Sequence, residues 1–121
     1  MVILNKKQHS DFVSKKFKPS FKFWIEYKGK PILGKGGAEI LEQVEKDKSI
    51  TKAAEKLGMS YRYVWNYLQR IEETIGEPVV NTYKGGRSGG GGAKLNKTGR
   101  ELLKEYRRLK KDLDEFVSKN T

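Results

Sequence analysis

The chain contains no cysteine and only one histidine, His9, among its 121 residues. The absence of cysteine excludes disulfide bonds and thiolate metal sites. With one histidine, no serine–histidine–aspartate set and no metal cluster can be assembled, so we expect neither an enzyme nor a bound cofactor or metal. No apolar run approaches the roughly 20 residues of a membrane helix, and the N-terminus lacks a signal-peptide pattern. We therefore expect a soluble, cytoplasmic protein of one domain's size.

Basic residues outnumber acidic ones, and the excess is unevenly distributed. The net charge is +11, from 26 lysines and arginines and 15 aspartates and glutamates. Residues 1–35 contain nine basic and two acidic residues, and residues 36–78 contain six basic and eight acidic ones. Residues 79–100 contain five basic and no acidic residues, and residues 101–121 contain six basic and five acidic ones. This distribution favours a polyanion as partner. An acidic membrane surface, or solubility alone, also fits the charge taken by itself.

Two short amphipathic segments lie on either side of Gly58. Apolar residues recur at helical spacing in both, and Ser49 and Ser60 stand where helix N-caps are expected. Gly58 can take the positive φ angle that ends one helix and turns the chain toward the next. Two helices joined by so short a turn indicate a helix-turn-helix over residues 49–75; an ordinary αα-hairpin in another bundle is the alternative. The apolar positions are Ile50, Ala53, Ala54 and Leu57, then Val64, Leu68, Ile71 and Ile75.

The residues before this motif predict a hairpin and one further helix. Apolar and polar side chains alternate from Phe21 to Tyr27, which is typical of a half-buried strand. Glycine and proline then mark a turn, and Ile32 begins a return strand, so we expect an N-terminal β-hairpin. A glycine-rich loop over 34–37 should open a helix from about Ala38 to Lys46, the first of three.

Glycine is concentrated in one segment after the motif. Pro78 ends the second helix, and residues 79–83 favour a strand. Six glycines then fall between Gly85 and Gly92, within a stretch that has no acidic residue. Alone, such a run is a flexible linker. Directly after a helix-turn-helix it is typical of the wing of a winged helix, whose glycines let the backbone approach DNA.

The last segment predicts a long helix with an apolar stripe. Thr98 and Glu101 match a capping box, and the apolar residues that follow recur at spacings of four and three. A helix of roughly 20 residues extends about 30 Å, farther than one small core covers. We therefore predict a homodimer through this stripe; the alternative is that the stripe packs on its own subunit. It consists of Leu102, Tyr106, Leu109, Leu113 and Phe116.

Segment 49–75 resembles the winged-helix domains of LysR-type regulators. With the wing included, the strings GMSYRYVWNYLQRIE and GGRSGGGGAKLNKTG resemble the N-terminal DNA-binding domain of the molybdate-dependent transcriptional regulators called ModE. They contain that family's GMSY tetrapeptide, its Trp65, and its glycine-rich wing ending in Leu95–Gly99. The resemblance covers about residues 20–118 and implies a winged helix that binds double-stranded DNA. It does not extend to the molybdate-binding modules of full-length members, so we expect no molybdate site in this chain.

The second helix of such a motif meets DNA with its outward, N-terminal face. Arg62 can donate two hydrogen bonds to a guanine, and Asn66 or Gln69 can pair with an adenine. Trp65 either touches sugar and base edges or braces the helix. The expected DNA-contacting residues are Ser60, Tyr61, Arg62, Trp65, Asn66 and Gln69 of this helix, Thr51 and Lys52 at the start of the preceding one, and Lys84, Arg87 and Lys94 of the wing.

These elements divide the chain into a basic arm (1–20), a winged helix-turn-helix (21–97) and a dimerisation helix (98–121). The expected fold class is mainly α with small β (α+β). The arm either contacts nucleic-acid backbone or remains solvated. We expect a homodimeric DNA-binding transcriptional regulator associated with the nucleoid. A sequence-tolerant architectural or chromatin protein is the first alternative. A protein-interaction adaptor is the second, and the acid-free wing argues against it.

Overall fold

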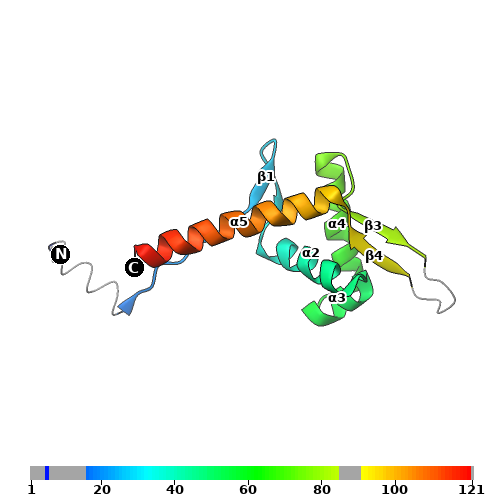
Figure 1. Cartoon of the computed structure of the whole chain (residues 1–121), viewed down its shortest axis with the longest axis horizontal. Coiled ribbons are helices and arrows are strands. Elements are labelled where there is room, and N and C mark those ends of the chain that lie inside the picture. Colours follow the sequence, from blue (N-terminus) through cyan, green and yellow to red (C-terminus); the bar gives the residue numbers. More distant parts are fainter. Residues whose placement is uncertain (1–4, 6–15, 85–90, 121) are drawn as a thin grey trace. The chain divides into compact units, whose positions relative to one another are not determined.

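The computed structural model describes Asn5, residues 16–84 and residues 91–120 (Figure 1). The chain forms two compact units, Phe23–Arg107 and a second that combines Met1–Lys22 with Arg108–Thr121. In chain order the elements are β1 (Ile25–Tyr27), β2 (Lys30–Leu33), α2 (Lys35–Asp47), α3 (Ile50–Leu57), α4 (Tyr61–Ile75), β3 (Val80–Tyr83), β4 (Gly92–Leu95) and α5 (Lys97–Lys119). The described residues are therefore mainly helical with two small antiparallel sheets, as the fold class predicts.

Helices α2, α3 and α4 build the core of the unit that extends from Phe23 to Arg107. Each contributes one buried face, so the three predicted helices are confirmed. Of the predicted inward residues, Leu57 and Ile75 are only partly buried against the core. Burying a valine, leucine or isoleucine side chain contributes roughly 1.5–3 kcal/mol relative to leaving it exposed. The core residues from these helices are Ile40, Leu41 and Val44 of α2, Ile50, Ala53 and Ala54 of α3, and Val64, Leu68 and Ile71 of α4.

Local capping sets the ends of α3 and α4 as the sequence predicts. The Ser49 hydroxyl oxygen accepts a hydrogen bond from the Lys52 backbone N–H at 3.1 Å, and Ser60 accepts one from Tyr63 at 3.0 Å. Gly58 ends α3 with φ +67°, in the left-handed region that glycine tolerates best. Its N–H bonds to carbonyl oxygens of the last turn, which turns the chain into α4.

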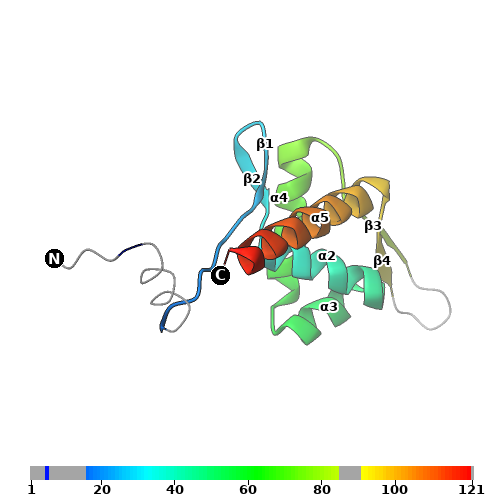
Figure 2. The ribbon, with the colours of Figure 1, turned by 60° about the vertical axis from the view of Figure 1, so that its left-hand side comes forward.

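Two hairpins flank the helices (Figures 1 and 2). Strands β1 and β2 pair antiparallel, and β2 packs against α4 and α2, confirming the predicted N-terminal hairpin. The first strand is shorter than predicted, beginning at Ile25 and not Phe21. Strands β3 and β4 pair from Val80↔Leu95 to Tyr83↔Gly92. The Ala93 N–H donates to the Lys48 carbonyl at 3.0 Å, which ties this hairpin to the turn between α2 and α3.

The glycine-rich stretch over 34–37, predicted as a loop, forms the N-cap and first turn of α2. Helix α2 begins at Lys35, three residues earlier than predicted, and Gly34 is its N-cap residue. Gly37 is buried under the Tyr67 hydroxyl, where a Cβ would collide with the tyrosine ring. A close helix–helix approach therefore explains this glycine, and periodicity alone could not show it.

The start of α5 is held by the segment that follows α4. The Asn96 Oδ1 accepts from the Gly99 N–H at 2.9 Å, while its Nδ2 donates to the Pro78 carbonyl at 2.7 Å. Thr98 donates to the Glu77 carboxylate at 2.6 Å. The predicted capping box of Thr98 and Glu101 is therefore wrong, because α5 begins one residue earlier and Asn96 caps it.

The first turns of α5 are part of the core. Leu103 is fully buried, and Tyr106 is buried with its ring stacked on Phe23 at 4.6 Å between centroids. Arg107 adds ion pairs to Glu42 and Glu45 of α2 at 3.3 and 3.7 Å. Tyr106 therefore packs within its own unit, as the sequence-based alternative for the stripe states.

No helix in the described part of the chain is both long and apolar enough to cross a lipid bilayer.

Gly99→Ala should lower the free energy of unfolding by about 1–3 kcal/mol, because the new methyl group would collide with the Val79 carbonyl oxygen. Urea denaturation measures this loss. Gly36→Ala is the matched control, since Gly36 is helical with no atom near its missing Cβ. That variant should be unchanged or more stable by up to about 1 kcal/mol. Equal stability of the two variants would contradict the close contact.

A second prediction concerns the ion pair that joins the end of α2 to α3. Lys56 Nζ lies 2.6 Å from Asp47 Oδ1, and Gln43 donates to the other carboxylate oxygen. The Lys56 hydrogen bond, then that of Gln43, holds the pKa of Asp47 below its ordinary value of 3.8. The lowered pKa contributes stability above pH 3.8 that is lost as the pH falls through the folded-state value.

Lys56→Gln should therefore lower the urea midpoint at neutral pH, and its difference from the unmodified chain should shrink as the pH falls below 3.8. Lys104→Gln, an exposed lysine of α5, is the control and should show no such pH-dependent difference. A Lys56→Gln effect that stays constant from neutral to acid pH would rule out the pKa linkage.

Candidate nucleic-acid interface

Helix α4 is strongly two-sided, and its outward side carries most of the predicted contact residues. Val64, Leu68 and Ile71 are buried against the other helices. On the opposite side, Arg62 and Asn66 are exposed and Gln69 is half-buried. Because these side chains recur at spacings of four and three, they form one polar stripe along the helix. The stripe offers a guanidinium and two amides, the groups that read base edges.

The two aromatic residues of the predicted set lie at one edge of this stripe. The rings of Tyr61 and Trp65 are nearly parallel, with centroids 6.3 Å apart and an interplanar angle of 10°. Tyr61 is half exposed, whereas Trp65 is half-buried and packs against the core. Trp65 also lines a hollow of about 180 Å³ between α4 and β3. Trp65 therefore contacts the core and lies beside the Tyr61 ring, with part of its surface accessible.

The starts of α3 and α4 meet the wing strands around a second hollow of about 200 Å³. Thr51 and Tyr61 line one side, and Thr82 and Tyr83 line the other. The structure thus brings together two predicted contact residues and two wing residues that sequence reasoning did not select. Lys52 is exposed on the same first turn of α3. Thr82 and Tyr83 could have been found from the strand pattern that places exposed polar groups beside the wing.

The wing is basic where the structure describes it. Lys84 and Lys94 are both exposed, Lys84 directly after β3 and Lys94 within β4 opposite Asn81. The Tyr83 ring covers Gly92, where any Cβ would collide with it. Arg87, the third predicted wing residue, lies outside the described residues.

The other edge of α4 carries aromatic residues that the sequence-based set omitted. Tyr63 is half exposed, and its ring lies 6.5 Å from that of Tyr67 between centroids. Burial raises the pKa of Tyr67 above its ordinary value, while a hydrogen bond with the Gly34 backbone acts in the opposite direction. Tyr67 is therefore neutral at physiological pH. Exposed Arg70 lies on the same edge of α4. This edge is beside the β1–β2 hairpin and not beside the wing.

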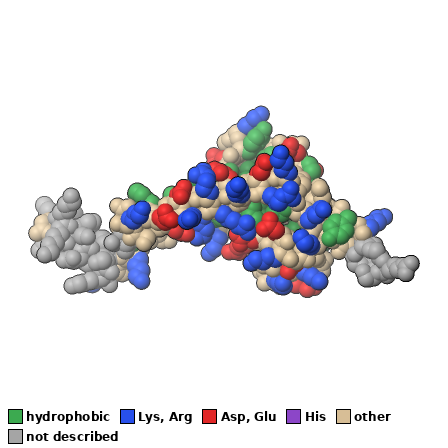
Figure 3. All heavy atoms as spheres, viewed as in Figure 1, with side chains coloured by type: hydrophobic (Ala, Val, Ile, Leu, Met, Phe, Trp, Pro, Cys, Tyr) green, Lys and Arg blue, Asp and Glu red, His purple; other side chains and the backbone are tan. Residues whose placement is uncertain are grey.

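The α5 side of the molecule differs in charge from the wing. Figure 3 shows lysine and arginine side chains interspersed with aspartate and glutamate along this face. Two i,i+4 ion pairs, Arg108–Asp112 and Lys110–Asp114, contribute to the mixture. This face lacks the uniform positive charge expected of a surface that covers phosphates.

The apolar stripe of α5 is graded in exposure. Leu102 is half-buried against the core and Tyr106 is buried. Leu109 and Leu113 are half-buried, whereas Phe116 is 63% exposed. Of the predicted interface residues, Tyr106 is therefore buried, while the other four keep some accessible apolar surface.

The comparisons with known proteins concern the family and the fold. Residues 37–100 match the family model described as "Bacterial regulatory helix-turn-helix protein, lysR family", which is more than half of the chain. The chain is 36% identical over 70 residues to the molybdenum transport protein ModE of Azotobacter vinelandii, covering 58% of this chain and 26% of that protein. It is 32% identical over 85 residues to the molybdenum-pterin-binding protein MopB of Rhodobacter capsulatus, covering 68% and 31%. The chain thus spans between a quarter and a third of the length of these relatives.

Among solved structures, the BenM DBD in complex with catB site 1 DNA superimposes with a TM-score of 0.51 at 25% identity. The match covers 67% of this chain and 83% of that one. This likeness confirms the winged-helix fold. The family and the fold are those of transcription regulators and not of enzymes, as the sequence predicts. The chain therefore belongs to the bacterial regulatory helix-turn-helix proteins of the LysR family, as a DNA-binding domain of the ModE type.

Proposed function

We propose that this chain is a homodimeric transcriptional regulator that binds specific sites in duplex DNA. The observation that carries the proposal is the polar stripe of α4, which is exposed because the opposite face of the helix forms the core. An α-helix fits the major groove, which is about 12 Å wide. A BenM DBD of similar fold has been solved with DNA, and this supports the same partner for the present chain.

On α4, each predicted contact residue of the polar stripe and the helix start has a role that its chemistry supports. Arg62 would donate two hydrogen bonds to guanine O6 and N7, and Asn66 or Gln69 would pair with adenine N6 and N7. Tyr61 would contact a phosphate or a thymine methyl group. Ser60 caps the helix through its oxygen and still has its hydroxyl proton to donate to a phosphate.

The first turn of α3 and the wing would hold the DNA backbone on either side of that groove. Thr51 and Lys52 are exposed at the start of α3, where free N–H groups and the helix dipole attract anions. Lys84 and Lys94, with Arg87 beyond the described residues, would contact phosphates or the minor groove. Trp65 would position Tyr61 by stacking against it.

The later part of α5 would form the dimer. Leu109, Leu113 and Phe116 present apolar surface at heptad-like spacing, and a second copy of the helix would cover it. We leave Tyr106 out of this interface, because its ring is already buried against Phe23, and assign Leu102 to the edge. A two-fold dimer implies two half-sites and a roughly palindromic operator.

Arg62→Ala should weaken binding to the selected operator by about 1–3 kcal/mol and relax base preference at one position. Lys94→Ala should weaken binding to DNA of any sequence by the same factor. It should also reduce the slope of log K against log salt by about one unit. Competition binding to operator and random duplexes over a salt series measures both effects, after the operator is selected from random DNA.

Equal losses on operator and random DNA for Arg62→Ala would defeat the base-reading role and favour the sequence-tolerant architectural alternative. No binding to duplex DNA at low salt would defeat the proposal as a whole. Since the matched segments of the ModE relatives cover only part of those proteins, we also propose that added molybdate leaves the affinity of this chain unchanged.

Phe116→Glu should convert the dimer to a monomer at micromolar concentration, because it buries a charge in the proposed interface. Light scattering reports the mass. Ser118→Glu adds the same charge two residues along the helix, on a different face, and should remain dimeric. A monomeric unmodified chain, or equal masses for both variants, would refute the proposed interface.

A further inference from the structure

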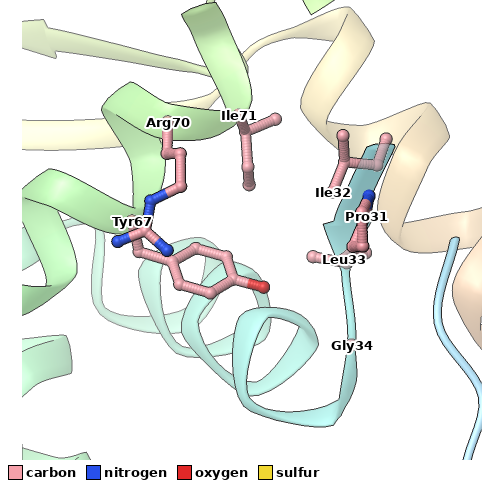
Figure 4. A pocket seen from close by; sticks show the side chains of 7 residues that line it. All are labelled: Pro31, Ile32, Leu33, Gly34, Tyr67, Arg70 and Ile71. Carbon is pink, nitrogen blue, oxygen red and sulfur yellow. The ribbon is translucent and has the colours of Figure 1, made fainter. Parts of the chain in front are cut away.

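A hollow of about 150 Å³ lies on the α4 edge away from the wing. Figure 4 shows Ile32 of β2 and Ile71 of α4 on its walls, with Tyr67 and Arg70 extending from α4. Pro31 and Leu33 complete the apolar lining, and Gly34 forms the edge at the start of α2. A cavity of this volume holds a group about as large as benzene, so one leucine or phenylalanine side chain fits it.

The surface around the hollow is rich in exposed aromatic side chains. Trp24 is 55% exposed, and its Cβ lies close to Gly34 at the edge of the hollow. Its indole N–H is held by Glu26 at 2.8 Å. Tyr63, half exposed, lies beside Tyr67. Tryptophan, tyrosine and arginine around an apolar pocket are the residues that dominate protein–protein binding energy.

The charge at this edge is positive. Arg70 is exposed at the hollow, and Lys30 and Lys35 flank the lining segment in sequence and are also exposed. None of the three has an ion pair with another residue in the described ranges. The Glu26 carboxylate, which accepts the Trp24 indole N–H, keeps its negative charge, and these three basic groups outnumber it. A ligand whose apolar group enters the hollow therefore binds more tightly if it carries negative charge beside that group.

We propose that this hollow docks an acidic segment of another protein that inserts one apolar side chain. The apolar side chain lies between Ile32 and Ile71, a neighbouring carboxylate pairs with Arg70, and Trp24 covers the segment from outside. A duplex fits less well, because the lining is mostly apolar, whereas phosphates and sugars are held by polar and charged groups. This docking site would let a DNA-bound domain contact a second protein, since it lies on the other edge of α4 from the wing.

The test is a titration of the ¹⁵N-labelled chain with the peptide acetyl-Asp-Glu-Leu-Glu-Asp-amide, followed by NMR. We expect chemical-shift changes at peptide concentrations up to about 1 mM. They should affect the backbone amides of Leu33, Gly34 and Arg70 and the indole N–H of Trp24. Replacing the peptide leucine by serine should abolish the shifts. Arg70→Glu should weaken binding about tenfold, and Trp24→Ala should weaken it as well, whereas Lys104→Glu, the same charge change on α5, should not.

Three outcomes would overturn the proposal. The first is a flat titration, or equal shifts with the serine peptide. The second is evidence that this edge is part of the DNA interface. Such evidence would be loss of peptide binding when duplex DNA is added, or a loss of DNA binding in Arg70→Glu as large as that in Arg62→Ala. The third is the same shifts on concentrating the chain alone, which would identify a second copy as the occupant. Retained DNA binding by Arg70→Glu separates this proposal from the proposed function.

Discussion

The one-sided burial of α4 is the constraint on which the rest of the structure depends. Val64, Leu68 and Ile71 are buried in a core to which α3 and β2, the neighbours of α4, contribute, and this packing determines which side chains of α4 remain outside. Arg62 and Asn66 are exposed for that reason. A helix with polar groups on all sides would have no preferred orientation. The same burial that stabilises the domain therefore aims its recognition surface.

Close backbone approaches then place the two hairpins around that helix. Gly99 lets the first turn of α5 reach the Val79 carbonyl, and Asn96 bonds both to α5 and to the Pro78 carbonyl. The Ala93–Lys48 hydrogen bond connects the wing to the start of the helix-turn-helix. These contacts are short and directional, so the wing strands, α3 and α4 line one hollow. The opposite edge of α4 is left to the β1–β2 hairpin, where the surface is aromatic and apolar.

Sequence patterns predicted the elements well where the signal was local. Serine caps and a positive-φ glycine depend on residues within one turn, so α3 and α4 begin and end where expected. Sequence patterns failed where the outcome depends on contacts with residues that are distant in the sequence. Gly37 lies within a helix, and glycine is needed there because the Tyr67 hydroxyl lies over it. Leu103 and not Leu102 enters the core, since both lie on an amphipathic helix and only packing selects between adjacent faces.

By itself, the sequence determined the helix-turn-helix, the two hairpins and the polar stripe of α4, because periodicity and caps are properties of neighbouring residues. It also determined the acid-free, glycine-rich character of the wing. Only the tertiary structure decided that Trp65 packs inward while Tyr61 faces out, that Tyr106 is buried on Phe23, and that a basic, aromatic hollow forms beside Arg70. Those outcomes depend on which distant segments meet, and burial of a side chain is decided by the partner that covers it.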